Sequence, residues 1–320
     1  MDRKIVRNAN IEVTSLGFGT SALGSMPDTY GFSVNEDRAK KTLFSILRSP
    51  VNLIDTSRNY GMGRSETRIG KVINQEDFLN SDVIISTKLD RDMDTNIFDA
   101  SRVRQSYEES LKALSLESVP ILYLHDPEYV ADIESIRGKN GAIAELFRLK
   151  EEGRVRAVGL AMGKLDLMQN LLSEWDFDCL ITHSRYTLMN RSAEWLIDDS
   201  YRKGISIFNA APFSGGMLAK GSSSFDKYVY QKATPDIIKR VEAYEDICTR
   251  YRIPLGVAAL QFSMRDPRIT STICGVSKPE RVKECVSWSD FPTSQDFWDE
   301  ILGIDYDVTD PEASRIYRPE

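Results

Sequence analysis

The sequence predicts an α/β fold: a (β/α)8 TIM barrel with an N-terminal β-hairpin and an extra C-terminal helix. Strand-like and helix-like segments alternate along the 320 residues, and no segment rich in Pro, Gly or Ser separates two halves. We therefore expect residues 1–320 to form a single domain. A doubly wound sheet is the alternative, but no G-x-G-x-x-G follows the first strand to hold a pyrophosphate.

Eight segments have the composition of buried parallel strands. Several are nearly continuous apolar runs, which is typical of strands that are covered on both faces. The predicted strands are 16–20, 52–56, 83–89, 121–125, 155–160, 179–183, 204–209 and 271–276.

Eight helical patterns lie between these strands and after the last of them. They are 36–48, 65–73, 100–113, 141–152, 164–173, 192–203, 235–251 and 279–286, with the extra helix at 294–302. Pro235 and Pro279 suit first-turn positions of helices, and Gly153 and Gly204 suit helix ends. Residues 4–13, with a turn at 8–10, are expected to form a hairpin across the bottom of the barrel.

Charge and composition exclude several classes of protein. The net charge is −7 and the basic residues are scattered, so we do not expect nucleic acid as a partner. The first 20 residues contain no apolar run of the kind found in a leader, and no apolar run of about 18 residues occurs in the sequence. We therefore expect a cytoplasmic protein without a membrane span. The four cysteines are far apart and the chain has two histidines, which argues against a metal centre. The oligomeric state cannot be predicted.

Four polar residues stand at or just after the ends of predicted strands, where a barrel of this kind places its reactive groups. Asp55, Lys88 and His125 lie at strand ends, and Tyr60 follows five residues after Asp55. A phenol has a pKa near 10, and a neighbouring ammonium would lower it. We expect Lys88 to lower the pKa of Tyr60 in this way, with Asp55 holding Lys88 and His125 binding the substrate oxygen. Tyr60 would then exchange a proton with the substrate.

The segment Asp-Thr-Ser-Arg-Asn-Tyr-Gly-Met-Gly-Arg-Ser-Glu at 55–66 resembles the signature of the aldo-keto reductase superfamily. The likeness covers about residues 5–298, and Lys88 and His125 fall where this family has its other two catalytic residues. The resemblance implies an NAD(P)-dependent oxidoreductase, with Asp55, Tyr60, Lys88 and His125 as the catalytic residues.

The family also implies where a nicotinamide cofactor binds. We expect free backbone N–H groups at 214–216 to bind phosphate, and a flexible turn is the alternative. Many relatives that use NADP have a Lys and a Ser or Thr where this chain has Gly275 and Val276. This favours NAD, with NADP still possible through Arg281. His183 either donates to the nicotinamide carboxamide or is a structural histidine. The expected cofactor contacts are His183, Pro212, Phe213, Ser214, Gly216, Gly275, Ser277 and Arg281.

Residues 185–188 and 209–213 are similar to the branch that contains L-galactose, L-fucose and D-threo-aldose dehydrogenases and pyridoxal 4-dehydrogenase. In this chain, other residues that face the cofactor in many relatives are replaced by Ala161, Met162 and either Ala210 or Ala211. The expected substrate is a small polar aldose or aldehyde, as in carbohydrate metabolism. The alternatives are an NADPH-dependent reductase of aldehydes or ketones, and a nicotinamide-binding regulatory subunit. Residues that could contact the substrate or wall its pocket are Tyr30, Phe32, Asp126, Trp288 and Trp298.

Overall fold

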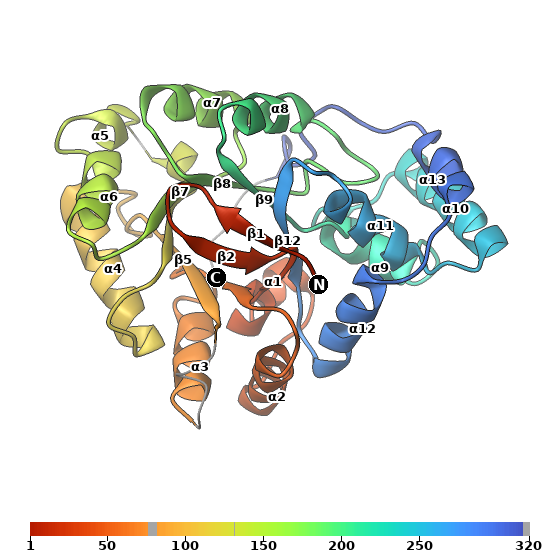
Figure 1. Cartoon of the computed structure of the whole chain (residues 1–320), viewed down its shortest axis with the longest axis horizontal. Helices are drawn as coiled ribbons and strands as arrows, with labels where there is room; N and C mark the ends of the chain where they lie inside the picture. The colour runs from red at the N-terminus through yellow and green to blue at the C-terminus, as the bar shows by residue number, and fades with distance from the viewer. Residues whose placement is uncertain (76–81, 131, 316–320) are drawn as a thin grey trace.

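Eight parallel strands form a closed barrel in the computed structural model, which describes residues 1–75, 82–130 and 132–315 (Figure 1). This confirms the fold predicted from the sequence. The strands, in order around the barrel, are β12 (Ile269–Gly275), β3 (Leu16–Gly19), β4 (Leu53–Asp55), β5 (Ile84–Leu89), β6 (Ile121–His125), β7 (Ala157–Ala161), β8 (Cys179–His183) and β9 (Ser206–Ala210).

The strand register brings the carboxyl ends of the strands together at one end of the barrel. Gly19 pairs with both Asp55 and Gly275, and His125 pairs with Ala161. Side chains that leave these last strand residues toward the axis therefore share one space, which is where barrel enzymes place their chemistry.

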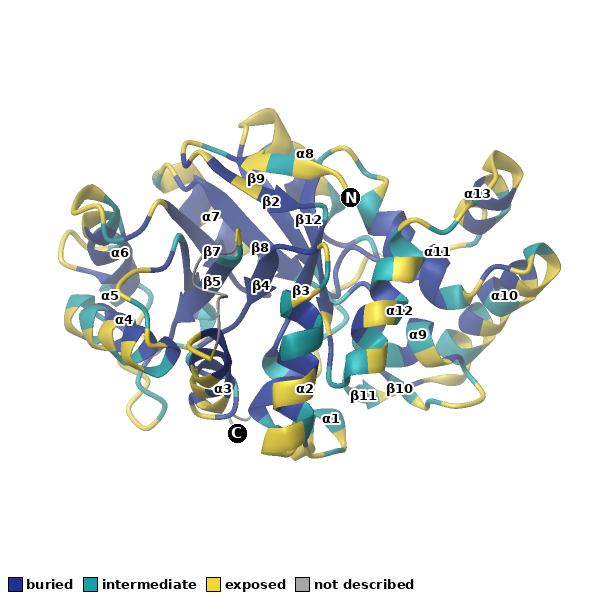
Figure 2. Cartoon of the chain, turned by 60° about the horizontal axis from the view of Figure 1, so that its bottom comes forward, coloured by how far each residue is buried: buried dark blue, intermediate teal, exposed yellow. Residues whose placement is uncertain are grey.

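Helices surround the barrel and bury their apolar faces against it, so that Figure 2 shows buried strands inside helices with exposed outer faces. The helices around the barrel include α2 (Glu36–Leu47), α3 (Arg64–Ile73), α4 (Ala100–Leu114), α6 (Ala142–Glu151), α7 (Leu165–Glu174), α8 (Glu194–Arg202), α11 (Leu255–Met264) and α12 (Pro279–Ser289). In the described residues, no helix combines the length and the apolar character needed to cross a membrane.

The helix before the last strand differs from the prediction. The predicted segment forms α10 (Pro235–Tyr251), but this helix packs against α13 (Gln295–Leu302) and α11. The helix that packs on β12 is α11, which the sequence reading missed. Eight consecutive residues of α11, 256–263, are buried, so the helix has no polar face and no amphipathic period to detect.

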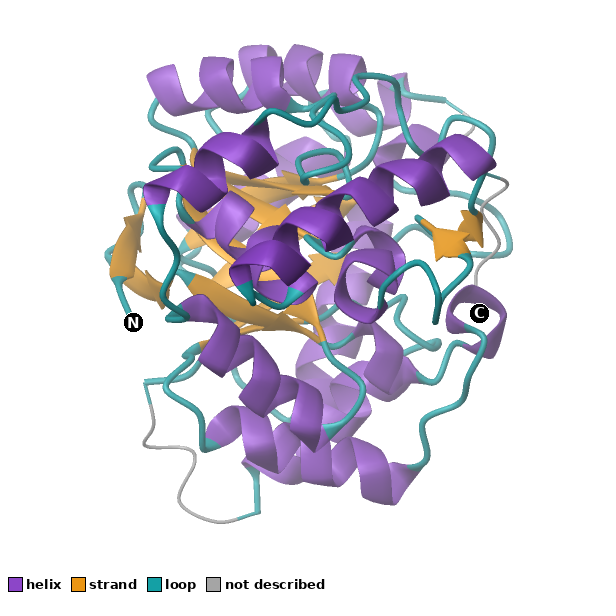
Figure 3. Cartoon of the chain, turned by 90° about the vertical axis from the view of Figure 1, so that its right-hand side faces the viewer, coloured by secondary structure: helices purple, strands orange, loops and turns teal. Residues whose placement is uncertain are grey.

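The opening hairpin, β1 (Arg3–Val6) and β2 (Ile11–Thr14), forms as predicted. Val6, Ile11 and Val13 pack in one cluster with side chains from inside the barrel, including Leu53 and Ile121. Figure 3 shows this hairpin at one end of the barrel and the short hairpin of β10 (Lys227–Tyr228) and β11 (Gln231–Lys232) toward the other. The β1–β2 hairpin therefore closes the end of the barrel that lies away from the strand carboxyl ends.

The segment that follows α13 returns to the loop after β8. Arg191 N–H donates to the Asp307 carbonyl at 2.8 Å, and the Asn190 amide donates to the Thr309 carbonyl, also at 2.8 Å. These bonds bring residues 310–315 to the carboxyl end of the barrel.

Candidate active site

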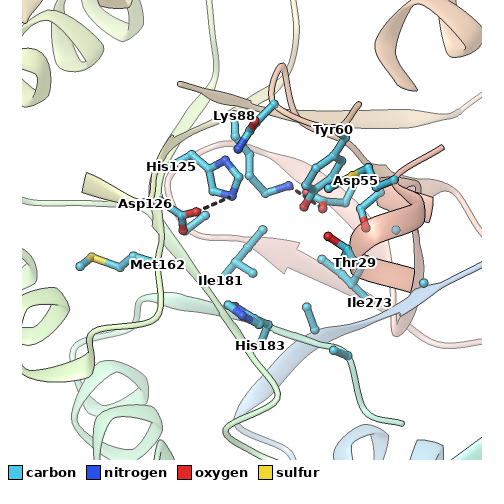
Figure 4. A pocket seen from close by; sticks show the side chains of 18 of the residues that line it. Thr29, Asp55, Tyr60, Lys88, His125, Asp126, Met162, Ile181, His183 and Ile273 are labelled. Carbon is cyan, nitrogen blue, oxygen red and sulfur yellow. Dashed lines mark hydrogen bonds and ion pairs between the residues drawn. The ribbon is translucent and has the colours of Figure 1, made fainter. Parts of the chain in front are cut away.

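The four residues predicted to be catalytic line one cavity at the carboxyl end of the barrel (Figure 4). Asp55 ends β4, Lys88 is the penultimate residue of β5, His125 ends β6, and Tyr60 lies in the loop between β4 and α3. Figure 4 shows the Tyr60 ring, the Lys88 ammonium and the His125 ring around one space. The cavity encloses about 170 Å³.

Lys88 and Asp55 form a buried ion pair. Lys88 Nζ donates to Asp55 Oδ2 at 2.7 Å and to the Thr56 carbonyl at 2.6 Å, while Ser86 Oγ donates to Asp55 Oδ1 at 2.9 Å. Their side chains are only 2% and 5% exposed, so each charge depends on the other. The expectation that Asp55 holds Lys88 agrees with this geometry.

The loop that carries Tyr60 passes very close to the turn after β3. A Cβ atom added to Gly24 would lie 2.7 Å from the Tyr60 carbonyl carbon, and Gly61 has a φ of 62°. Glycine is therefore required on both sides of this contact. The contact fixes the Tyr60 backbone, and the ring lies beside Lys88, with Nζ 4.8 Å from the ring centroid.

The acidity of Tyr60 differs from the expectation. Burial raises the pKa of Tyr60 well above its usual range, and the negative charge of Asp55 adds to this. The ammonium of Lys88 does not reverse that direction because its charge is already paired with Asp55. The net pKa of Tyr60 is therefore raised and its hydroxyl is neutral, so the prediction that Lys88 brings this pKa below its usual range is wrong.

His125 is held from behind by a carboxylate and a hydroxyl. Its Nδ1 lies 2.7 Å from Asp90 Oδ1 and 3.1 Å from Ser57 Oγ, and its ring packs edge-on against Tyr60 at 6.1 Å between centroids. Burial alone would lower the pKa of His125, but the carboxylates of Asp126 and Asp90 outweigh it and raise the pKa overall.

Asp90 and Ser57 contact His125 at the candidate site, and neither was predicted from the sequence. Ser57 lies inside the motif at 55–66, and Asp90 comes two residues after Lys88. That proximity was the available signal, but the pairing of Asp90 with Ser57 and His125 joins three separate loops and strand ends.

The expected phosphate loop after β9 is only partly as predicted. Ser214 N–H donates to the Ala211 carbonyl at 3.1 Å and Gly216 N–H to the Phe213 carbonyl at 2.9 Å, so these two groups are not free for phosphate. Pro212, Phe213 and Ser214 are buried, and Phe213 packs on Trp288 at 5.8 Å between ring centroids. The expectation of free N–H groups at Ser214 and Gly216 is wrong because the loop closes on itself as two turns.

A group of cations lies beside this loop and the end of β12. The pKa of Lys220 is lowered, mainly by burial and then by the positive charges of Arg281, Lys278 and Lys227. Such a group of cations fits the negative pyrophosphate of a dinucleotide. Of these four cations, only Arg281 was predicted from the sequence.

The other cofactor residues predicted after β12 lie at the same place. Gly275 is exposed at the strand end, where an added Cβ would meet nothing within 4 Å. The Ser277 carbonyl accepts a hydrogen bond from Arg38 Nε at 2.7 Å, and Arg281 pairs with Glu284 at 3.0 Å.

His183 lines the cavity, but its Nε2 lies 2.6 Å from Glu312 Oε2. Glu312 also accepts a hydrogen bond from Arg185 at 2.9 Å and pairs with Arg315, which lines the cavity as well. The sequence reading missed Glu312 and Arg315 because residues 303–315 have no periodic pattern that would predict where they fold.

The aromatic residues expected around the pocket divide into two groups. Tyr30 lines the cavity together with Tyr230, and Phe32 lies next to Tyr30 at 5.9 Å between ring centroids. Trp298 is buried against Phe297 in α13, so its expected place at the pocket is wrong. Trp288 packs on Phe213 and does not line the cavity.

Comparison with known proteins agrees with this geometry. The chain is 26% identical to pyridoxal 4-dehydrogenase of Microbacterium luteolum, covering 93% of this chain and 95% of the relative. It is 29% identical to L-galactose dehydrogenase of Arabidopsis thaliana, covering 90% and 88%. Both proteins belong to the branch expected from the sequence.

A solved aldo-keto reductase from Bacillus halodurans, in its holo form, shares the fold with a TM-score of 0.78 at 18% identity, covering 99% of this chain and 100% of that structure. The model of the aldo/keto reductase family matches residues 15–305. The chain therefore belongs to the aldo/keto reductase family of oxidoreductases, whose members use nicotinamide cofactors.

Proposed function

We propose that this protein is a dehydrogenase that exchanges hydride between a nicotinamide and a small polar aldose or pyridoxal-like aldehyde, with Tyr60 as general acid and base. The observation that carries the proposal is the convergence of Asp55, Tyr60, Lys88 and His125 on one cavity. These residue types supply a proton donor, a charge that orients it and a hydrogen-bond donor for the substrate oxygen.

Proton transfer is the task of the chain's own residues. The neutral phenol of Tyr60 gives its proton to the carbonyl oxygen of an aldehyde when the reaction runs as a reduction. In the direction of oxidation, the Tyr60 oxygen acts as the phenolate and takes the proton of the substrate hydroxyl group, which regenerates the neutral phenol. The Lys88 ammonium, 4.8 Å from the ring centroid, stabilises the phenolate that reduction leaves behind.

The nicotinamide supplies or accepts the hydride when it is bound. We propose that the cations Lys220, Lys278 and Arg281 hold its pyrophosphate and adenosine end, and that His183 lies near the carboxamide. NAD is favoured over NADP because Val276 is buried and apolar, and Gly275 has no side chain, so neither residue can bind a 2′-phosphate.

The cavity favours a small substrate with several polar groups. It encloses about 170 Å³ and is lined by the polar side chains of Thr29, Tyr30, Asp126 and Arg315. Asp126 can accept hydrogen bonds from sugar hydroxyls, and Arg315 can donate them. The relatives named for pyridoxal and for L-galactose act on compounds of this size and polarity.

The test compares two sets of reactions on the purified protein. Oxidation of L-fucose, L-galactose and pyridoxal with NAD⁺ is measured beside reduction of an aromatic aldehyde with NADPH. We expect the NAD⁺ reactions to be faster, and titration of each nucleotide to show tighter binding of NAD. Efficient turnover of the aldehyde with NADPH alone would favour a general reductase. Nucleotide binding without turnover of any substrate would favour a regulatory subunit.

A further inference from the structure

Asp90 is anchored so that its carboxylate can have only one orientation. Its backbone N–H donates to Ser106 Oγ at 3.0 Å and its carbonyl accepts from Arg102 Nε at 3.0 Å, both from α4. Its Oδ2 accepts from Ser57 Oγ at 2.8 Å and from Asn59 N–H at 2.9 Å. The remaining oxygen, Oδ1, is the one that faces His125 at 2.7 Å.

This contact decides which nitrogen of His125 carries a proton. A carboxylate accepts hydrogen bonds and does not donate them, so Nδ1 must be protonated to bind Asp90 Oδ1. Ser57 Oγ gives its own proton to Asp90, so it too accepts from Nδ1–H. The other nitrogen, Nε2, faces the cavity, as Figure 4 shows.

Three charged groups and one neutral phenol surround His125. Asp90 from the end of β5 lies behind the ring, and Asp126, next in the chain, lies 3.8 Å from Nε2. Lys88 opposes a positive charge on the ring, while Tyr60 packs on it edge-on and remains neutral. The two carboxylates outweigh the ammonium and the burial of the ring, and the pKa of His125 is raised.

We infer that Asp90 is a positioning residue for this reaction: it fixes one proton of His125 on Nδ1 and favours the doubly protonated ring, whose Nε2–H is directed at the substrate oxygen. The inference rests on the proposed function, because it assigns the reacting oxygen to the cavity. Its structural half, the protonation of His125, does not depend on any substrate.

The proton on Nε2 determines whether His125 can donate a hydrogen bond to the substrate oxygen. With Nδ1–H bound to Asp90, a neutral His125 would present a bare Nε2, which can only accept a hydrogen bond. A carbonyl oxygen needs a donor, so only the charged ring can bind and polarise it during reduction. Loss of the Nε2 proton therefore stops His125 from aiding reduction, although Tyr60 still holds its own proton.

The direct test uses the small number of histidines. His125 and His183 are the only two in the sequence, so ¹⁵N-histidine labelling gives two sets of ring signals, which the His183→Gln variant assigns. We expect His125 in the native protein to carry its proton on Nδ1 throughout its titration. In Asp90→Asn, the titration midpoint should move to lower pH by about one pH unit or more, the usual effect of removing one adjacent opposite charge.

The matched control is Asp94→Asn, an exposed carboxylate on the same loop. It should leave the titration of His125 unchanged. If Asp90→Asn does not fold, the labelled native protein still tests the contact, because the hydrogen bond to Asp90 requires the proton of the neutral ring to stay on Nδ1. An equal midpoint in the native protein and the variant, or a native neutral ring protonated on Nε2, overturns the inference.

The kinetic test measures kcat/KM for aldehyde reduction against pH. The activity of the native protein should fall at high pH as His125 loses its proton, and in Asp90→Asn this fall should begin at lower pH. A lower rate with an unshifted profile would mean that Asp90 is only structural. If neither oxidation with NAD⁺ nor reduction of an aldehyde is observed, the proposed function fails, but the labelling experiment still decides the state of His125.

Discussion

At the scale of single residues, the ion pair of Lys88 and Asp55 predicts a large and separable effect on stability. Lys88→Met leaves the Asp55 carboxylate buried without its cation, which typically costs about 3–5 kcal/mol of unfolding free energy. The double variant Asp55→Asn, Lys88→Met removes both charges and should be clearly more stable than Lys88→Met. Urea unfolding of all three proteins measures this, and equal stability of the single and double variants would contradict the pairing.

Substitution of Tyr60 should lower the reaction rate and leave the affinity for the nucleotide nearly unchanged. Tyr60→Phe removes the hydroxyl that exchanges the proton but keeps the ring that packs beside His125. We expect kcat to fall by about 10²-fold or more, with little change in the dissociation constant of the nucleotide. Steady-state rates and a fluorescence titration test this, and a variant with the native rate would remove Tyr60 from the mechanism.

The sequence was sufficient to predict that four residues meet in one cavity, but not their charge states, and their catalytic role stays a prediction. Residue type and position at or just after strand ends indicated Asp55, Tyr60, Lys88 and His125, because a barrel brings such positions together. The pKa of Tyr60 depends on burial and on the pairing of Lys88 with Asp55, which only the packed structure shows. Asp90 was missed for the same reason, since its partners come from other segments.

At the scale of elements, α3 and α4 pack so closely that position 70 of α3 must be glycine. A Cβ added to Gly70 would lie 2.3 Å from the Ala113 carbonyl oxygen, and main chain cannot move aside as a side chain can. Gly70→Ala should therefore lower the unfolding free energy by about 1–3 kcal/mol, despite the better helix propensity of alanine.

Gly275→Ala is the control for that substitution, because its added Cβ would meet nothing within 4 Å. Thermal unfolding of both variants beside the native protein gives the comparison. If Gly70→Ala were as stable as Gly275→Ala, the close approach of α3 and α4 would be wrong.

Element prediction succeeded where hydrophobic periodicity carries the information and failed where it does not. The strands and the amphipathic helices appear within a few residues of their expected bounds. Helix α11 is buried on all sides, so its sequence has no regular change between polar and apolar faces from which a helix could be predicted. The loop at 214–216 has the composition of a phosphate loop, but its internal hydrogen bonds could not be read from composition.

At the scale of the whole molecule, Glu128 should make stability depend on pH. Its Oε1 accepts hydrogen bonds from the N–H groups of Gly163 and Lys164, yet burial and then the Asp126 charge raise the pKa of Glu128 from 4.5 to about 7. The folded state therefore binds this proton more tightly than the unfolded chain does. The resulting stability is present below pH 4.5 and is lost as the pH rises through about 7.

Glu128→Gln keeps an oxygen acceptor and cannot ionise. Above pH 7 it should be more stable than the native protein by on the order of 1–3 kcal/mol, and at pH 4 the two should be nearly equal. Denaturant unfolding at both pH values measures the difference. The control is Glu151→Gln at an exposed site of α6, and a similar gain in that variant would contradict the assignment to Glu128.

The alternating strand and helix segments were enough to predict the closed barrel. They were not enough to predict how the chain beyond α13 closes over the strand ends, because ion pairs such as Arg185–Glu312 fix that segment and no repeating pattern does. The assignment of residues 1–320 to a single domain stays a prediction.

The β1–β2 hairpin also bears on the order of events in a catalytic cycle. Its side chains fill the amino-terminal end of the barrel. The nicotinamide and the substrate of the proposed reaction therefore both enter and leave the cavity at the carboxyl end of the strands. If the substrate covers the nicotinamide, the nicotinamide has to arrive first and leave last. We therefore expect a compulsory binding order, which product-inhibition kinetics would reveal as one competitive pair of ligands among otherwise mixed patterns.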